Sequence, residues 1–96
     1  MRRAAKVDAS QPGIVDALED AGYRVEIIGL PVDLAVLIPR TTGVFQMLEC
    51  KTLTKSGKVP KDKRQQDQQQ FLEETGTPIV GTPQQALDVM ARHGSM

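Results

Sequence analysis

The sequence predicts a single α/β domain in which helices cover a small mixed sheet, with the element order α-β-β-β-α-β-α. Three observations predict it: an amphipathic helix opens the chain, three β-rich segments with short connections follow, and a helix-strand-helix unit closes it. The 96 residues leave room for one domain over 1–96, and 40% hydrophobic residues can bury a core. A basic stretch over 1–9 is expected to be a flexible arm and 93–96 a frayed tail.

The opening helix is expected to begin after Ser10 and to stop at Gly22. Ser10 is preferred as the N-cap because capping from Asp8 would place Pro12 at the fourth helical position, where its missing N–H is needed. One helix face is apolar at helical spacing and consists of Ile14, Val15, Leu18 and Ala21.

Three strands are expected over 24–28, 32–38 and 44–51, arranged as an antiparallel meander. The middle segment is apolar almost throughout, which is typical of a strand that is covered on both faces. A turn over 39–43 makes the second and third strands hairpin partners.

The second half of the chain predicts a glutamine-rich helix over 65–74, a strand over 77–80 and a last helix. Thr82 is expected to cap the last helix, with Pro83 at its first position and Gln85 closing a capping box.

Composition and charge exclude several classes of protein. Twelve basic and twelve acidic residues give zero net charge, so the molecule as a whole gives no electrostatic argument for nucleic-acid binding. Aromatic residues make up 3%, too few for a base-stacking platform. A single cysteine excludes a disulfide framework and favours a cytoplasmic location, and one histidine beside it leaves zinc short of ligands. No apolar run is long enough for a membrane span.

The tripeptide Glu49-Cys50-Lys51 ends an apolar strand. Residues two apart on a strand share a face, so Glu49 and Lys51 should lie side by side while Cys50 points into the opposite layer. A carboxylate and an ammonium in that place cost desolvation. A divalent cation, bound by the Glu49 carboxylate and the Cys50 carbonyl, would offset that cost.

Asp33 is a second anomaly because it lies at the start of the most apolar stretch of the chain. If the second and third strands pair, their outer ends meet and Asp33 comes near Glu49 and Lys51. Two carboxylates, an amine and a carbonyl can hold Mg²⁺ against a phosphate and activate a water molecule. The structural alternative is that Glu49 and Lys51 form only an ion pair and that Asp33 caps a turn.

A basic segment follows this tripeptide. It is suited to sequence-independent contacts with phosphates. Its candidate DNA-binding residues are Lys55, Lys58, Lys61, Lys63 and Arg64.

Pro31-Val32-Asp33, followed after fifteen residues by Glu49-Cys50-Lys51, resembles the signature of the PD-(D/E)XK nuclease superfamily. Within it, the chain is most similar to small VRR-NUC-type, Holliday-junction-resolvase-like nucleases that phages often encode. The similarity extends over nearly the whole chain. It also includes Asp8, Gln11, residues 14–18, residues 68–72, residues 78–80 and residues 86–87.

The resemblance implies a restriction-endonuclease-like fold and a role for each matching residue. Asp33 and Glu49 would bind the metal, with the Cys50 carbonyl as a backbone ligand. Lys51 would orient the attacking water or stabilise the developing charge. Gln68 would support the lysine and the water. The neighbouring alternatives to that glutamine are Gln65 and Gln69.

Two positions depart from the family pattern. Val32 separates Pro31 from Asp33, so either the proline precedes the strand or a bulge absorbs the extra residue. The acid that many members carry on the first helix is matched by Gly13. The acids closest to that position are Asp16 and Glu19.

These features predict a metal-dependent DNA endonuclease that uses Mg²⁺ or Mn²⁺ and no organic cofactor, with branched DNA as one candidate substrate. The alternative is a nuclease-fold subunit that binds nucleic acid but is weak or inactive as a catalyst, which the missing helix acid and the zero net charge favour. The small size and an open sheet edge predict a homodimer with no membrane partner. The sequence leaves open whether the substrate is DNA or RNA.

Overall fold

The predicted order of helices and strands is confirmed in the structure, a computed structural model that describes residues 7–52 and 66–94. Each strand is shorter than predicted. The elements are α1 (Gln11–Asp20), β1 (Val25–Ile27), β2 (Leu34–Leu37), β3 (Phe45–Cys50), α2 (Gln66–Thr75), β4 (Ile79–Val80) and α3 (Pro83–Ala91).

The four strands form one mixed sheet in the order β1-β2-β3-β4. β2 runs antiparallel to both β1 and β3, with Leu34 opposite Leu48, which confirms the meander. β4 lies parallel to β3, with Glu49 opposite Ile79. This parallel pairing follows because the chain crosses over through α2 before it returns to the sheet.

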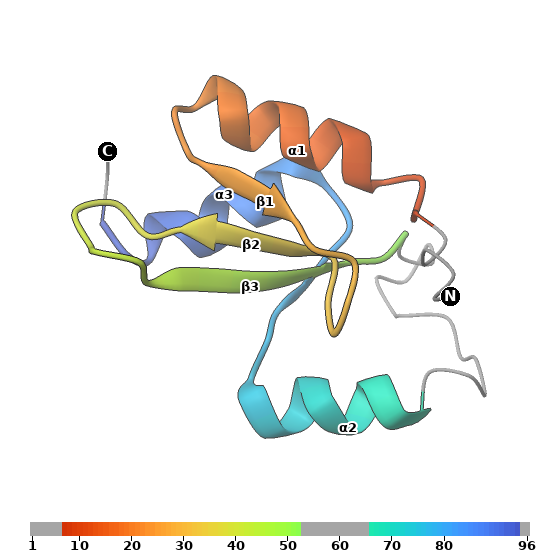
Figure 1. The fold of residues 1–96 in the computed structure, drawn as a ribbon. Coiled ribbons are helices and arrows are strands. Elements are labelled where there is room, and N and C mark those ends of the chain that lie inside the picture. Colours follow the sequence, from red (N-terminus) through yellow and green to blue (C-terminus); the bar gives the residue numbers. More distant parts are fainter. Residues whose placement is uncertain (1–6, 53–65, 95–96) are drawn as a thin grey trace.

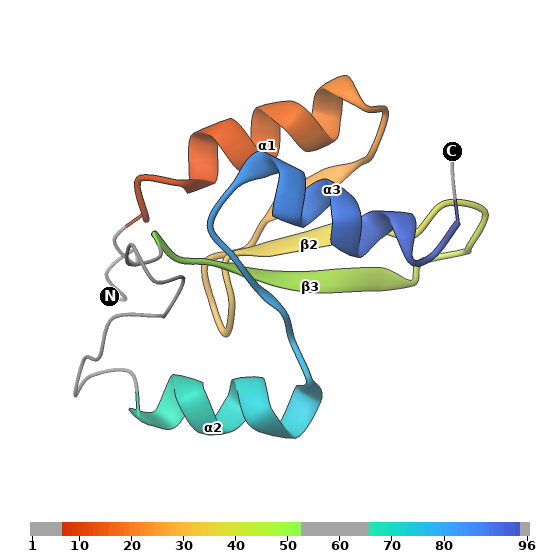
Figure 2. The same cartoon turned by 180° about the vertical axis from the view of Figure 1, so that it is seen from behind.

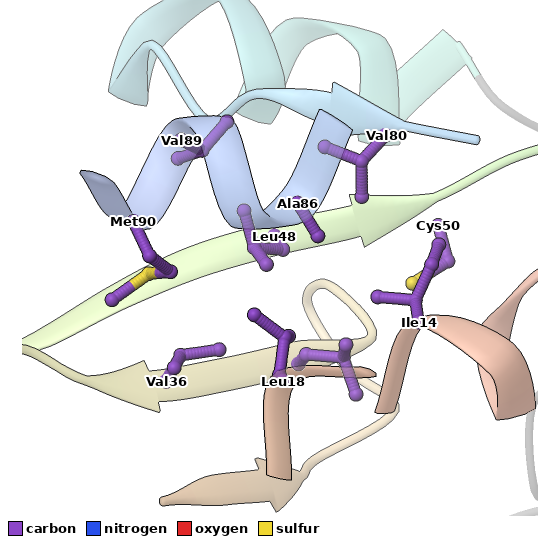
Figure 3. Close-up of a cluster of buried hydrophobic side chains, with 10 residues drawn as sticks. Ile14, Leu18, Val36, Leu48, Cys50, Val80, Ala86, Val89 and Met90 are labelled. Carbon is purple, nitrogen blue, oxygen red and sulfur yellow. The ribbon is translucent and has the colours of Figure 1, made fainter. Parts of the chain in front are cut away.

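The helices lie on both sides of the sheet (Figure 1 and Figure 2). α1 and α3 lie side by side over one face, and α2 lies on the other side. Between the sheet and the pair α1 and α3, apolar side chains form the main core (Figure 3). Its buried members are Ile14, Leu18, Leu34, Val36, Leu48, Cys50, Val80, Ala86, Val89 and Met90.

The prediction that the middle strand is covered on both faces is confirmed only in part. Burial alternates along β2: Leu34 and Val36 are buried, whereas Ala35 and Leu37 are only half-buried. Phe45 of β3 pairs with Leu37 on that second face and is 40% exposed. The physical reason is that the two helices packed on the main core both lie on the opposite face of the sheet.

The helix ends agree in part with those predicted from the sequence. Thr82 Oγ1 accepts a hydrogen bond from the N–H of Gln85 at 3.1 Å, which confirms the cap of α3. The Gln85 side chain accepts a hydrogen bond from the N–H of Gly81 at 2.7 Å. In a capping box it would instead accept from the N–H of the N-cap residue, Thr82, which follows Gly81. After α1 the chain turns at Gly22, whose φ of 97° favours glycine.

The two ends of the chain lie partly outside the described residues: the arm expected over 1–9 is described only from residue 7, and the tail expected over 93–96 only to residue 94. His93 Nε2 lies 2.7 Å from Oε1 of Gln46. In the part of the chain that the structure describes, no helix has the length and apolar character needed to cross a membrane.

Candidate functional site

Asp33 and Glu49 lie opposite each other where β2 begins and β3 ends. The register pairs Leu34 with Leu48, and continuing it by one residue places Asp33 across from Glu49 on the same face of the sheet. Oδ2 of Asp33 accepts a hydrogen bond from the backbone N–H of Cys50 at 2.8 Å. The meeting of these strand ends, expected from the hairpin, is present in the structure.

Glu49 is a buried carboxylate with an incomplete set of partners. It is 1% exposed, and its Oε2 lies 3.2 Å from Nζ of Lys51, so the two side chains lie side by side as predicted. Its other oxygen, Oε1, is buried and has no hydrogen-bond partner among the described residues. A buried polar atom without a partner destabilises a fold by about 1–3 kcal/mol. A ligand that satisfied this oxygen would therefore be stabilising.

Burial dominates the electrostatics of both carboxyl groups. Burial raises the pKa of Asp33, although the N–H of Cys50 and the charge of Lys51 oppose the rise. Burial also raises the pKa of Glu49, and the negative charge of Asp33 raises it further, against the effect of Lys51. A divalent cation between two such groups would favour the charged form of both.

Cys50 faces the opposite layer, as predicted, and belongs to the main core. Burial, followed by the charges of Asp33 and Glu49, raises the pKa of its thiol to about 12. The thiol therefore stays protonated at neutral pH and is unreactive. Any contribution of Cys50 to the site comes from its backbone.

The structure does not bring every predicted residue to this place. Gln68 belongs to α2, but its side chain is outside the described residues, and Gln65 lies outside them altogether. Gln69 is exposed and donates a hydrogen bond to Glu73 at 3.2 Å. The predicted phosphate contacts also lie outside the described residues; they are Lys55, Lys58, Lys61, Lys63 and Arg64.

The acids considered on α1 do not reach the carboxylate pair. Asp16 and Glu19 are exposed, and neither is among the charges that shift the pKa of Asp33 or of Glu49. A Cβ added at Gly13 would lie 3.9 Å from Cγ of Pro83, so that position faces the start of α3. α1 therefore supplies no acid to the pair from the position that the family pattern uses.

Asp8 is a residue beside the site that the sequence analysis did not place there. Its Oδ2 accepts hydrogen bonds from the N–H and the hydroxyl of Ser10, at 3.0 and 2.6 Å, and from the hydroxyl of Thr52 at 2.8 Å. Ser10 precedes α1 as predicted, but its side chain makes no capping bond to the helix. The available signal was the pattern Asp8-Ala9-Ser10, in which an aspartate can accept from the residue two positions later.

The oxygen ligands present fit a hard divalent cation only in part. Asp33 and Glu49 offer carboxylate oxygens, which Mg²⁺ and Mn²⁺ prefer, and the buried Oε1 of Glu49 has no hydrogen-bond partner among the described residues. Across residues 7–52 and 66–94, no group of three or more His, Cys, Asp or Glu side chains is arranged to hold a metal ion. A bound cation would therefore need water, backbone or substrate oxygens as well.

Comparison of the chain with protein-family models, with curated proteins and with solved structures finds no match.

Proposed function

We propose that this protein is a metal-dependent DNA endonuclease with a restriction-endonuclease-like fold. The observation that supports it best is the buried pair Asp33 and Glu49, which face each other across two strand ends with Lys51 alongside. Fold stability does not by itself explain Glu49, because apolar residues of similar size in place of buried charges are often as stabilising or more so. The buried Oε1 of Glu49, which has no hydrogen-bond partner among the described residues, is better explained by a ligand.

The residues of the pair would divide the work of phosphodiester hydrolysis. Mg²⁺ or Mn²⁺ held by Asp33 and Glu49 would supply activation of water and neutralisation of phosphate charge. The N–H of Cys50 fixes one oxygen of Asp33, which orients the other. Lys51 places a positive charge next to the pair, where it would stabilise the negative charge that develops on the attacked phosphate.

DNA is the proposed substrate because a cluster of cationic residues follows Lys51 in the sequence, within residues 55–64. We include a homodimer in the proposal because β1 is an edge strand of only three residues, and its Ile27 is 63% exposed. Two copies would offer two sites to two strands of a branched substrate.

A nuclease-fold subunit that binds nucleic acid without cutting it is the second candidate. Two observations favour it: Asp16 and Glu19 lie exposed and away from the pair, and no third metal-ligating side chain joins Asp33 and Glu49 within the described residues. Such a subunit would bind DNA through its lysines in a salt-dependent way and would need no cation.

Cleavage assays separate the two candidates. Supercoiled, single-stranded and four-way-junction DNA would be incubated with Mg²⁺, Mn²⁺ or EDTA. The proteins would be the wild type, Glu49→Ala, Lys51→Ala and the control Glu26→Ala. Glu26 is a matched control because it forms an exposed ion pair with Arg24 at 2.8 Å on the same sheet. The endonuclease is supported if the wild type and the control Glu26→Ala cut DNA only with a cation and both site variants, Glu49→Ala and Lys51→Ala, do not cut it. Binding without cutting by the folded wild type would support the second candidate instead.

A further inference from the structure

Asp8 joins two segments that are far apart in the sequence. Through its Oδ2 it holds Ser10, at the start of α1, and Thr52, just beyond the end of β3. Both ribbon views show these two chain segments next to each other (Figure 1 and Figure 2). Thr52 directly follows Lys51, whose own N–H donates to the carbonyl of Val80 at 3.0 Å. Asp8 is therefore fixed at the margin of the carboxylate pair.

The carboxylate of Asp8 is charged and close enough to act on the pair. Burial alone would raise the pKa of Asp8, but the hydrogen bonds from Ser10 and Thr52 outweigh that effect and lower it. The charge of Asp8 in turn contributes to the raised pKa of Asp33. Asp8 does not join a coordinating group in this structure, since no three acidic, histidine or cysteine side chains among the described residues are so arranged.

An independent observation indicates that a ligand belongs among these acids. Oε1 of Glu49 is buried and has no hydrogen-bond partner within residues 7–52 and 66–94, in a side chain that is 1% exposed. Glu49 lies across from Asp33, and Asp33 accepts a hydrogen bond from the N–H of Cys50. Cys50 lies two residues before Thr52, which binds Asp8. Three carboxylates thus lie around the end of β3, and one of them has an oxygen with no hydrogen-bond partner in the part of the chain that the structure describes.

We propose that Asp8 is a third carboxylate of the cation site that does not coordinate the ion but strengthens its binding to Asp33 and Glu49 through its fixed negative charge. The inference rests on the proposed function, because it presupposes that this pair binds a cation. The hydrogen bonds from Ser10 and Thr52 are what keep the charge in place. Asp8 is in this sense a positioning residue for the ion.

Mn²⁺ alone is the probe, and its dissociation constant would be measured by electron paramagnetic resonance without DNA. Asp8→Asn removes the charge but keeps an oxygen that can accept from Ser10 and Thr52. Thr52→Val keeps the charge and removes one hydrogen bond. Asp20→Asn, on the exposed end of α1, controls for the loss of one charge elsewhere on the same helix.

The charge predicts a distinctive pattern of affinities. Asp8→Asn should weaken Mn²⁺ binding by roughly threefold to tenfold at low ionic strength, as expected for one charge acting through a partly aqueous path. The loss should shrink to less than about twofold at 1 M KCl, where the Debye length is about 3 Å. Thr52→Val and Asp20→Asn should each change the affinity by less than about twofold at low salt. Circular dichroism would verify that every variant is folded.

Three results would overturn the inference. An unchanged Mn²⁺ affinity in folded Asp8→Asn would show that the charge has no role. A loss of about a hundredfold that persists at high salt would show direct coordination. An equal loss in Asp8→Asn and Thr52→Val that is undiminished at 1 M KCl would show a purely structural role. If the wild type itself bound no Mn²⁺, the proposed function would fail first, and that outcome is distinct from these three.

Discussion

Replacing Glu49 by glutamine should stabilise the protein without a cation and destabilise it relative to the wild type with one. The carboxylate is 1% exposed, and its Oε1 has no partner among the described residues. Burying it costs about 1–3 kcal/mol. The contact with Lys51 at 3.2 Å offsets only part of this cost, because both side chains of this largely buried pair lose their hydration. Glu49→Gln should therefore raise the free energy of unfolding in EDTA by about 1 kcal/mol.

The cation should reverse this order. A ligand at one hundred times its dissociation constant adds about 2.7 kcal/mol to the stability of a protein that binds it only when folded. The wild type should gain that amount from Mn²⁺, and Glu49→Gln should gain little, because an amide oxygen replaces the carboxylate. In a domain of this size, 1 kcal/mol corresponds to a shift in Tm of about 4–8 °C. Thermal unfolding in EDTA and in Mn²⁺ measures both effects.

The control is Glu26→Gln, which disrupts an exposed ion pair with Arg24 and should change the unfolding free energy by less than about 0.5 kcal/mol in either buffer. A Glu49→Gln variant that lost more than about 1 kcal/mol in EDTA would refute the reasoning. It would mean that the ion pair with Lys51 is a structural element whose strength exceeds its desolvation cost. Equal responses of wild type and variant to Mn²⁺ would refute the ligand role of Glu49.

In EDTA, the free energy of unfolding should fall as the pH rises above the unfolded pKa values, which are about 3.8 for Asp33 and 4.5 for Glu49. The reason is that folding raises the pKa of both carboxyl groups, so their protonated forms stabilise the folded state. Urea titrations across this range should show a flatter profile for the double variant Asp33→Asn/Glu49→Gln. Lys51→Met leaves the Glu49 carboxylate without its ammonium partner and should cost about 3–5 kcal/mol in EDTA by urea unfolding, with part of the loss restored by Mn²⁺. Leu48→Ala, at a fully buried core position, should lower the free energy of unfolding by about 2–5 kcal/mol. Phe45→Ala should lower it clearly less, because Phe45 is 40% exposed in the same strand, and thermal unfolding compares the two variants.

The order of elements could be predicted because each one carries its own local signal. Apolar spacing locates α1, the alternation and turns locate β1 to β3, and Thr82 with Pro83 locates the start of α3. Coverage of β2 could not be predicted in the same way. An apolar run indicates that a strand is hydrophobic, but the placement of the helices determines which face of the strand is covered. Both α1 and α3 pack on the face that holds Leu34 and Val36.

The carboxylate pair could also be anticipated, because one assumption, the hairpin across residues 39–43, brings Asp33 and Glu49 together. The contact of Asp8 with Thr52 could not, since 44 residues separate them and no strand register links them. That contact depends on how the start of α1 lies against the end of β3. Strand pairings within a sheet can be predicted from the alternation of apolar residues and from the turns between strands. Contacts between layers depend on packing, which local sequence patterns do not determine.

The clearest departure from ordinary folding rules in this chain is where two buried acids, Asp33 and Glu49, face each other beside the buried apolar pair Leu34 and Leu48. Local consistency would place apolar residues at Asp33 and Glu49, and such a substitution would remove both the desolvation cost and the unpartnered oxygen. Real proteins break local rules mainly at functional sites. The violation here is concentrated in one place: both acids face each other, Lys51 lies beside one, and the charge of Asp8 bears on the other. An ion pair between Glu49 and Lys51 does not by itself account for the second buried carboxylate across from it, whereas a divalent cation accounts for an excess of negative charge around a single strand end.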